Sequence, residues 1–242
     1  HQENSGVAGS RNRGLTEARG HFINILDGDD LLYPQFLEKS INHLKRKPNV
    51  DIVHSSWKLF SDSGKQIRIV PAPSSEDYLY DLLLGNMFAV NALLYRSAFL
   101  KKVGPVKEGL APTEDWEFMI RCAKAGAHFD RINDVLVGVR EVPNSARKNP
   151  ASQKNRFFPV INLVFDGSMP AKYEQLKDLS IVKHHFYLMS DYLDWGFQDA
   201  AISHFETALD LISKSNIFSR FGEKWVTEFL PKLNSTQTSR LL

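Results

Sequence analysis

The stretch FINILDGDDLLYP, residues 22–34, runs an apolar segment directly into three carboxylates, Asp27, Asp29 and Asp30. The apolar half has the composition of a strand, and the acidic residues follow where a turn is expected. Like charges this close together repel one another unless a cation neutralises them. The stretch therefore predicts a buried strand that ends at a site for positive charge.

The residues on both sides of this stretch alternate between helical and strand-like patterns. A short helix is expected before residue 22. The order continues as strand patterns at 50–60, 88–96 and 129–141, and helix patterns at 35–47, 78–86, 98–104 and 116–126. This alternation predicts an α/β domain over residues 1–147, with a mixed sheet flanked by helices.

The composition changes at about residue 144, where the chain becomes basic, polar and poor in large apolar residues. We expect residues 148–170 to form a basic loop or linker. Three segments after it, at 173–196, 197–215 and 218–233, show amphipathic helical periodicity. They predict a helical C-terminal subdomain over residues 171–242.

Bulk composition limits the classes of function. The chain has 242 residues, 43% of them apolar and 24% charged, as in ordinary globular proteins. Its 30 basic residues exceed its 28 acidic residues by only two, so no nucleic-acid partner is expected. A single cysteine, Cys122, excludes an internal disulfide and suits a reducing compartment. No apolar run and no signal-peptide pattern points to the membrane, so we expect a cytoplasmic location.

Three interpretations compete for the acidic turn. An EF-hand loop starting at Asp27 is excluded, because Leu31 and Leu32 stand where an oxygen ligand and the turn glycine are required. A phosphatase of the haloacid-dehalogenase kind would use the first carboxylate as nucleophile and the second as acid/base. In the third interpretation, a divalent cation held by the carboxylates bridges the two phosphates of a nucleotide-sugar. The turn alone leaves the last two open.

A longer pattern, NSGVAGSRNRGLTEARGHFINILDGDD, covers residues 4–30. It resembles the inverting GT-A glycosyltransferases of family two, which share a glycine-containing loop, Arg-Asn-x-Gly-Leu, Ala-x-Gly, an apolar strand and Asp-x-Asp-Asp. The resemblance implies a GT-A-like (Rossmann-like) mixed sheet and a divalent metal, Mn²⁺ or Mg²⁺, held by Asp29 with Asp27. It also implies a set of nucleotide-sugar-binding residues: Arg11 near the diphosphate, Asn12, Asp27 and Asp30.

A second acidic motif, TEDW at residues 113–116, follows the first by 88 positions from Asp27 to Asp115 (115 − 27). It resembles the Glu-Asp motif with which the same family opens a helix. Inversion requires a carboxylate that takes the proton from the acceptor hydroxyl, and we assign this role to Asp115, with Glu114 as the second catalytic candidate. Trp116 is expected to bind acceptor, because an indole can stack on a sugar face. The competing interpretation is a plain helix cap.

The predicted last strand leads into VGVREVPNSARKN, residues 137–149. Many members of the family have Tyr-Arg-x-His followed by serine here, and this chain keeps Arg140 and Ser145 but has Val142 in place of the histidine. Arg140, a nucleotide-sugar-binding candidate, could form a basic flap over the diphosphate together with Arg147 and Lys148. A solvated loop is the competing interpretation of this basic run.

The family's first strands, which hold the nucleotide base and ribose, have no counterpart in this sequence. We therefore expect an N-terminally truncated fold that starts about one βαβ unit late, either as a fragment or with a partner supplying the rest.

Adjacent His184 and His185 would point about 100° apart on a helix, so they cannot share an ion in the usual i, i+4 manner. Structural roles are expected for both. His54 and His128 have no partners nearby in the sequence, and we expect them on surfaces or edges.

The resulting hypothesis is metal-assisted transfer of a sugar, with inversion, from a nucleotide-diphospho-sugar donor to an acceptor hydroxyl. The acceptor would be a saccharide, a lipid-linked group or a protein, in polysaccharide biosynthesis. Peripheral membrane association and a homo-oligomer stay open. The alternatives are a haloacid-dehalogenase-like phosphatase and a non-catalytic remnant that binds sugar or nucleotide.

Overall fold

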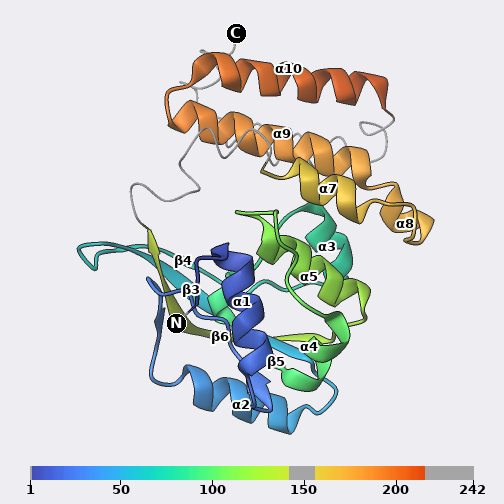
Figure 1. Cartoon of the computed structure of the whole chain (residues 1–242). Coiled ribbons are helices and arrows are strands. Elements are labelled where there is room, and N and C mark those ends of the chain that lie inside the picture. Colours follow the sequence, from blue (N-terminus) through green and yellow to red (C-terminus); the bar gives the residue numbers. More distant parts are fainter. Residues whose placement is uncertain (1, 142–155, 216–242) are drawn as a thin grey trace. The chain divides into compact units, whose positions relative to one another are not determined.

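The computed structural model describes residues 2–141 and 156–215, which fall into two compact units (Figure 1). The first unit comprises residues 1–82 and 86–147, and the second comprises residues 83–85 and 148–242. Both acidic motifs lie in the first unit.

A six-stranded mixed sheet forms the frame of the first unit, with the strand order β1-β5-β3-β6-β2 and with β4 paired to β3. The central strands β3 (Ile52–Ser61) and β6 (Phe129–Glu141) are parallel. All other pairings between the described strands are antiparallel, and they bring in β1 (Phe22–Ile23), β2 (Leu31–Leu32), β4 (Gln66–Val70) and β5 (Leu93–Arg96).

The acidic stretch crosses the sheet. Its apolar half forms only the two-residue strand β1, paired with β5, and the two residues after the acidic turn form β2, paired with β6. Because β1 and β2 stand at opposite ends of the strand order, residues 24–30 pass over the start of β5 and the end of β6. The predicted strand is therefore shorter than expected, and its continuation is a crossing loop.

Opposite faces of the sheet are covered by different helices. Leu94 of β5 belongs to the core cluster that includes Phe36 and Leu44 of α2 (Phe36–Arg46). The next residue, Tyr95, contacts Phe118 of α5 (Glu114–Lys124) at a centroid distance of 6.3 Å. Successive side chains of a strand point to opposite faces, so α2 and α5 lie on different sides of the sheet.

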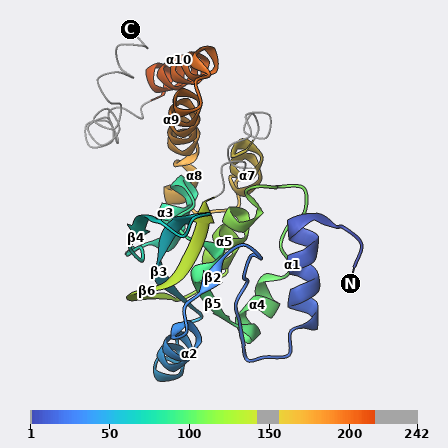
Figure 2. The same ribbon diagram turned by 90° about the vertical axis from the view of Figure 1, so that its left-hand side faces the viewer.

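The described part of the first unit also contains α1 (Gly6–Glu17), most of α3 (Tyr78–Leu84), the 3₁₀ turn η1 (Val90–Ala92) and α4 (Ser97–Val103). Figure 2 shows α1, α4 and α5 on the same side of the sheet. Helix α1 has no buried residue, so an apolar face does not hold it in place. Its position depends on the polar contacts described below.

His54 is a core residue, and the expectation of a surface or edge position is wrong. It lies in β3, is 1% exposed and packs against the rings of Tyr78 and Phe88. Burial disfavours the charged imidazole and lowers the pKa of His54 to about 3. The first half of β3 is buried throughout, because the strand is central in a sheet covered on both faces.

The described part of the second unit is helical, with α7 (Phe158–Val164), α8 (Ala171–Glu174), α9 (Lys177–Asp194) and α10 (Gln198–Lys214). Helix α7 corrects the expectation of a linker over 148–170, because Val160, Ile161 and Val164 form a buried apolar stripe. Helices α9 and α10 form a hairpin around Leu188, Met189 and Ala201 (Figure 1). The third predicted helix, at 218–233, lies outside the described residues.

Two histidines of α9 take different structural positions. His184 is buried, and its Nδ1 lies 2.7 Å from the carbonyl oxygen of Ser180. His185 Nδ1 lies 2.9 Å from Nδ1 of His204 on α10.

Across residues 2–141 and 156–215, no helix has the length and hydropathy required to cross a bilayer.

Candidate functional site

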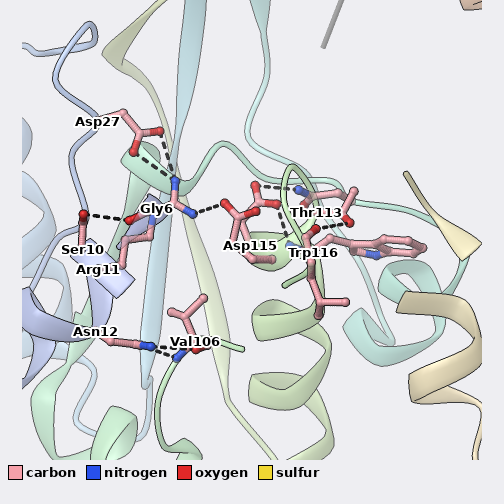
Figure 3. Close-up of polar contacts among 12 residues, drawn as sticks. Gly6, Ser10, Arg11, Asn12, Asp27, Val106, Thr113, Asp115 and Trp116 are labelled. Carbon is pink, nitrogen blue, oxygen red and sulfur yellow. Dashed lines mark hydrogen bonds and ion pairs between the residues drawn. The ribbon is translucent and has the colours of Figure 1, made fainter. Parts of the chain in front are cut away.

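Arg11 connects the two acidic motifs. Its Nη2 donates to Oδ1 of Asp27 at 3.0 Å (Figure 3), and its Nη1 donates to Oε1 of Glu114 at 2.7 Å. The side chains of Arg11 and Glu114 are only 10% and 6% exposed. Burial lowers the pKa of Arg11, but Asp27, Glu114 and Asp115 outweigh it and leave this pKa above its usual value. One guanidinium thus brings together residues that lie far apart in the sequence.

Asn12 has a different role from the one expected. Its Nδ2 donates to the carbonyl oxygen of Val106 at 2.9 Å, and its Oδ1 accepts the Val106 N–H at 2.7 Å (Figure 3). Both ends of the amide are therefore occupied by backbone. This corrects the nucleotide-binding assignment: Asn12 attaches α1 to the segment that precedes α5, and so helps to place Arg11.

Helix α5 begins with the second acidic motif and presents its two carboxylates differently. Glu114 is buried and points to Arg11. Asp115 is half-buried, accepts the Trp116 N–H at Oδ1 at 2.8 Å and accepts Nδ2 of Asn86 at Oδ2 at 3.1 Å. Adjacent helical residues point about 100° apart, which explains why one carboxylate is enclosed and the other can be reached.

Trp116 is a core residue, and the structure corrects the acceptor-binding assignment. It is 1% exposed, and its indole N–H donates to the carbonyl oxygen of Leu82 at 2.6 Å. A ring in this position has no open face on which a sugar could stack. The apolar side of α5 must cover the sheet, and Trp116 lies on that side.

Asp30 and Arg140 hold the acidic turn against β6. The backbone N–H of Arg140 donates to Oδ1 of Asp30 at 2.7 Å, and Nε of Arg140 donates to the carbonyl oxygen of Asp29 at 3.1 Å. The Arg140 guanidinium also lies over the Phe60 ring, 4.9 Å from its centroid. The contacts of Arg140 with the turn are therefore structural, and its role toward a nucleotide-sugar stays a prediction. Val142, Ser145, Arg147 and Lys148 lie outside the described residues.

Two carboxylates of the turn have the chemistry that a hard cation requires. Asp29 is exposed, and the side chain of Asp27 is 38% exposed. Arg11 uses only part of the capacity of Asp27, because a carboxylate offers about four lone-pair sites. Magnesium-type sites commonly combine one or two carboxylates with substrate phosphates. The carboxylates of Asp27 and Asp29 therefore fit Mn²⁺ or Mg²⁺ that is shared with a diphosphate. Residues 2–141 and 156–215 contain no group of three or more His, Cys, Asp or Glu side chains that could hold a metal ion by themselves.

Asn91 is a residue that the sequence reasoning missed. It is buried in η1, next to the acidic turn, and forms hydrogen bonds with Asp27 and Asp30. The only signal in the sequence is a polar residue inside the apolar run FAVNALLYR, residues 88–96. Asn86, which contacts Asp115, carried no signal.

Residues 1–102 match the model of the family described as "Glycosyl transferase family 2". This part of the chain belongs to that family. The predicted family is therefore confirmed. The match ends before α5, so the assignment of the Glu-Asp motif depends on the contact between Arg11 and Glu114.

Two relatives are named as uncharacterized glycosyltransferases. A Methanocaldococcus jannaschii protein is 31% identical over 167 residues, which cover 67% of this chain and 56% of the relative. A Haemophilus influenzae protein is 32% identical over 123 residues, which cover 50% of this chain and 46% of the relative. The chain thus spans about half the length of these relatives.

Solved structures confirm the α/β fold. Staphylococcus aureus TarS in complex with UDP-GlcNAc gives a TM-score of 0.56 at 14% identity, over 98% of this chain and 70% of TarS. A mannosyltransferase of Pyrobaculum calidifontis, in complex with GDP-Man and Mn²⁺, gives 0.52 at 16% identity, over 99% of this chain and 65% of that enzyme. At these identities the likeness concerns the GT-A-like mixed sheet.

Proposed function

We propose that this family 2 chain transfers a sugar from a nucleotide-diphospho-sugar to an acceptor hydroxyl, with inversion and with help from a divalent metal. The observation that carries the proposal is the Arg11 bridge between Asp27 and Glu114. It connects the acidic turn, which suits a metal ion bound to a diphosphate, with helix α5, which carries the half-buried carboxylate of Asp115. Donor and acceptor groups are needed side by side for a direct displacement.

Asp27 and Asp29 would hold the metal, which would stabilise the negative charge of the departing diphosphate. Arg11 orients Asp27 and balances the charge of Glu114. TarS was solved with UDP-GlcNAc and the Pyrobaculum enzyme with GDP-Man and Mn²⁺, which supports a nucleotide-sugar donor and leaves the base open.

Asp115 would take the proton from the acceptor hydroxyl as it attacks the anomeric carbon. The half-buried position of this carboxylate supports its role, and Asn86 and the Trp116 N–H orient it. Glu114 is enclosed by its contact with Arg11, so an acceptor hydroxyl reaches Asp115 more readily. We therefore retain Asp115 as the catalytic base and treat Glu114 as a positioning residue.

The test is a transfer assay with Mn²⁺ and a panel of UDP- and GDP-sugars, with saccharide, lipid-linked and peptide acceptors. We expect release of the nucleoside diphosphate and a product whose anomeric configuration, read by proton NMR, is opposite to that of the donor. Nucleotide binding without release would favour the non-catalytic remnant. Hydrolysis of simple phosphate esters would favour the phosphatase.

A further inference from the structure

The side chain of Asn91 binds both ends of the acidic turn. It is 3% exposed, its Oδ1 accepts the N–H of Asp27 at 2.8 Å, and its Nδ2 donates to Oδ2 of Asp30. The turn also has its own bond, from the N–H of Asp30 to the carbonyl oxygen of Asp27 at 3.2 Å. One buried amide thus connects the first and last carboxylate residues of the turn.

Asn91 is itself held in place by backbone and side-chain contacts. Its carbonyl oxygen accepts Nδ2 of Asn24 at 2.8 Å, and the same Nδ2 donates to the carbonyl oxygen of Leu93 at 2.8 Å. Asn91 precedes β5, whereas Arg140, which donates to the other oxygen of Asp30, lies one residue before the end of β6. The Asp30 carboxylate therefore ties the turn to two different strands of the sheet.

We propose that Asn91 is a positioning residue, which with Asp30 orients the turn so that Asp27 and Asp29 meet the metal diphosphate. This inference rests on the proposed function. Asp30 is then the structural partner of Asn91, rather than a ligand of metal, ribose or sugar. Hydrogen bonds to a charged group are stronger than neutral ones, and a buried donor left without a partner is costly.

The arrangement allows a test in which the two side chains are exchanged. In the Asn91→Asp/Asp30→Asn variant, the carboxylate at position 91 can accept the Asp27 N–H and also an N–H of the amide at position 30. The carbonyl oxygen of that amide can accept the Arg140 N–H. All three bonds are kept and the net charge is unchanged, but position 30 loses its carboxylate.

Two single-site variants complete the set. Asn91→Leu removes both side-chain bonds and keeps the branched shape and the number of heavy atoms of the side chain. Ser56→Ala is the matched control, because buried Ser56 also donates one bond, to the carbonyl oxygen of Asn133 at 2.9 Å, and accepts one, from the Ala72 N–H at 2.8 Å. Neither partner of Ser56 belongs to the turn.

Two measurements are made on each variant of the full chain. Hydrogen exchange reports the protection of the Asp27 amide, and calorimetry reports the affinity for UDP and for GDP with and without Mn²⁺. In Asn91→Leu we expect the Asp27 amide to lose protection and the Mn²⁺-dependent affinity to fall by about 10–100-fold, as for residues that orient metal ligands. The exchanged pair should recover both, and Ser56→Ala should change neither.

Each other outcome has a distinct meaning. Lost protection with unchanged Mn²⁺-dependent affinity would show that Asn91 is merely structural. Normal protection in Asn91→Leu would overturn the clamp itself. If Asn91→Leu fails to fold, an exchanged pair that folds but binds weakly would show that Asp30 acts as a ligand. Failure of the wild-type chain to bind either nucleotide with Mn²⁺ would overturn the proposed function, and the exchange data would still decide whether Asn91 holds the turn.

Discussion

Arg11 donates a 2.7 Å hydrogen bond to Glu114, a residue 103 positions further along the chain. Glu114 is buried, Arg11 is only 10% exposed, and the same guanidinium also reaches Asp27. This contact joins a helix without an apolar face to the helix that carries the proposed base. The geometry of the candidate site therefore depends on one cation enclosed between two carboxylates.

Removal of the Arg11 guanidinium should destabilise the first unit. Arg11→Met leaves Glu114 buried without its partner, which typically costs about 3–5 kcal/mol in the free energy of unfolding. The additional change Glu114→Gln should recover part of this loss, because the buried charge is then absent. Urea unfolding followed by tryptophan fluorescence measures both effects. An unchanged midpoint in Arg11→Met would contradict the structural importance of the bridge.

Replacement of Asp29 should uncouple metal from nucleotide. If Asp29 and Asp27 hold Mn²⁺ or Mg²⁺ together with a diphosphate, the metal should strongly increase affinity for the nucleoside diphosphate. Asp29→Asn should abolish this increase and leave the fold intact, because Asp29 is exposed. Calorimetric titration with and without Mn²⁺ is the measurement, with Asp199→Asn, an exposed carboxylate of α10, as the control. Equal coupling in wild type and Asp29→Asn would remove Asp29 from the metal site.

Replacement of Asp115 should stop transfer without loss of donor binding. Asparagine keeps the volume and one acceptor oxygen but removes the basicity, so Asp115→Asn should reduce turnover by about 10²–10⁴-fold. Both kcat and kcat/KM should fall, because the lost interaction belongs to the transition state. If Asp115 only caps the helix, transfer stays near normal, since asparagine is itself a good cap. That result would make Glu114 the next carboxylate to test.

Acidification should weaken the fold through His54. The unfolded imidazole has its usual pKa of about 6.5, whereas the pKa of buried His54 is lowered to about 3. Between these values the unfolded chain binds the extra proton, so stability falls as the pH falls from about 6.5. His54→Gln should remove on the order of 2 kcal/mol of this dependence between pH 6.5 and 4.5.

Urea midpoints measured across that pH range test the prediction, with exposed His21→Gln as the control. The lower limit of pH 4.5 keeps the titration of folded Asp130 outside the measured range. Burial raises the pKa of this carboxyl, but hydrogen bonds from Lys47 and His43 outweigh burial and leave it at about 2. The same slope in His54→Gln and wild type would show that other groups carry the dependence.

The thiol of Cys122 should be unreactive in the folded chain. Burial raises the pKa of Cys122 to about 12, which lowers the thiolate fraction near pH 8 by roughly 10³-fold relative to an exposed thiol. A disulfide reagent should therefore react only as fast as the unit opens, and urea should restore the normal rate. Rapid labelling of the native chain would contradict the burial of this side chain.

The sequence alone was sufficient for the family and the fold class. The pattern over residues 4–30 contains the loop, the basic residues and the acidic turn in a fixed order, and residues 1–102 match the family. Helix α2 and strands β3 and β6 followed from periodicity, because a buried face repeats with the period of its own element. Local patterns of this kind need no knowledge of distant partners.

Only the tertiary structure decided how the site is built. A sequence pattern places Trp116 next to two acidic residues, but the packing of α5 on the sheet turns its indole into the core and Glu114 toward Arg11. Asn91 meets Asp27 and Asp30 because the start of β5 and the end of β6 lie at the same edge of the sheet, under the crossing segment. Such contacts depend on strand order and on which side of a helix faces the sheet. These properties arise when the elements pack together, so no local stretch of residues contains them.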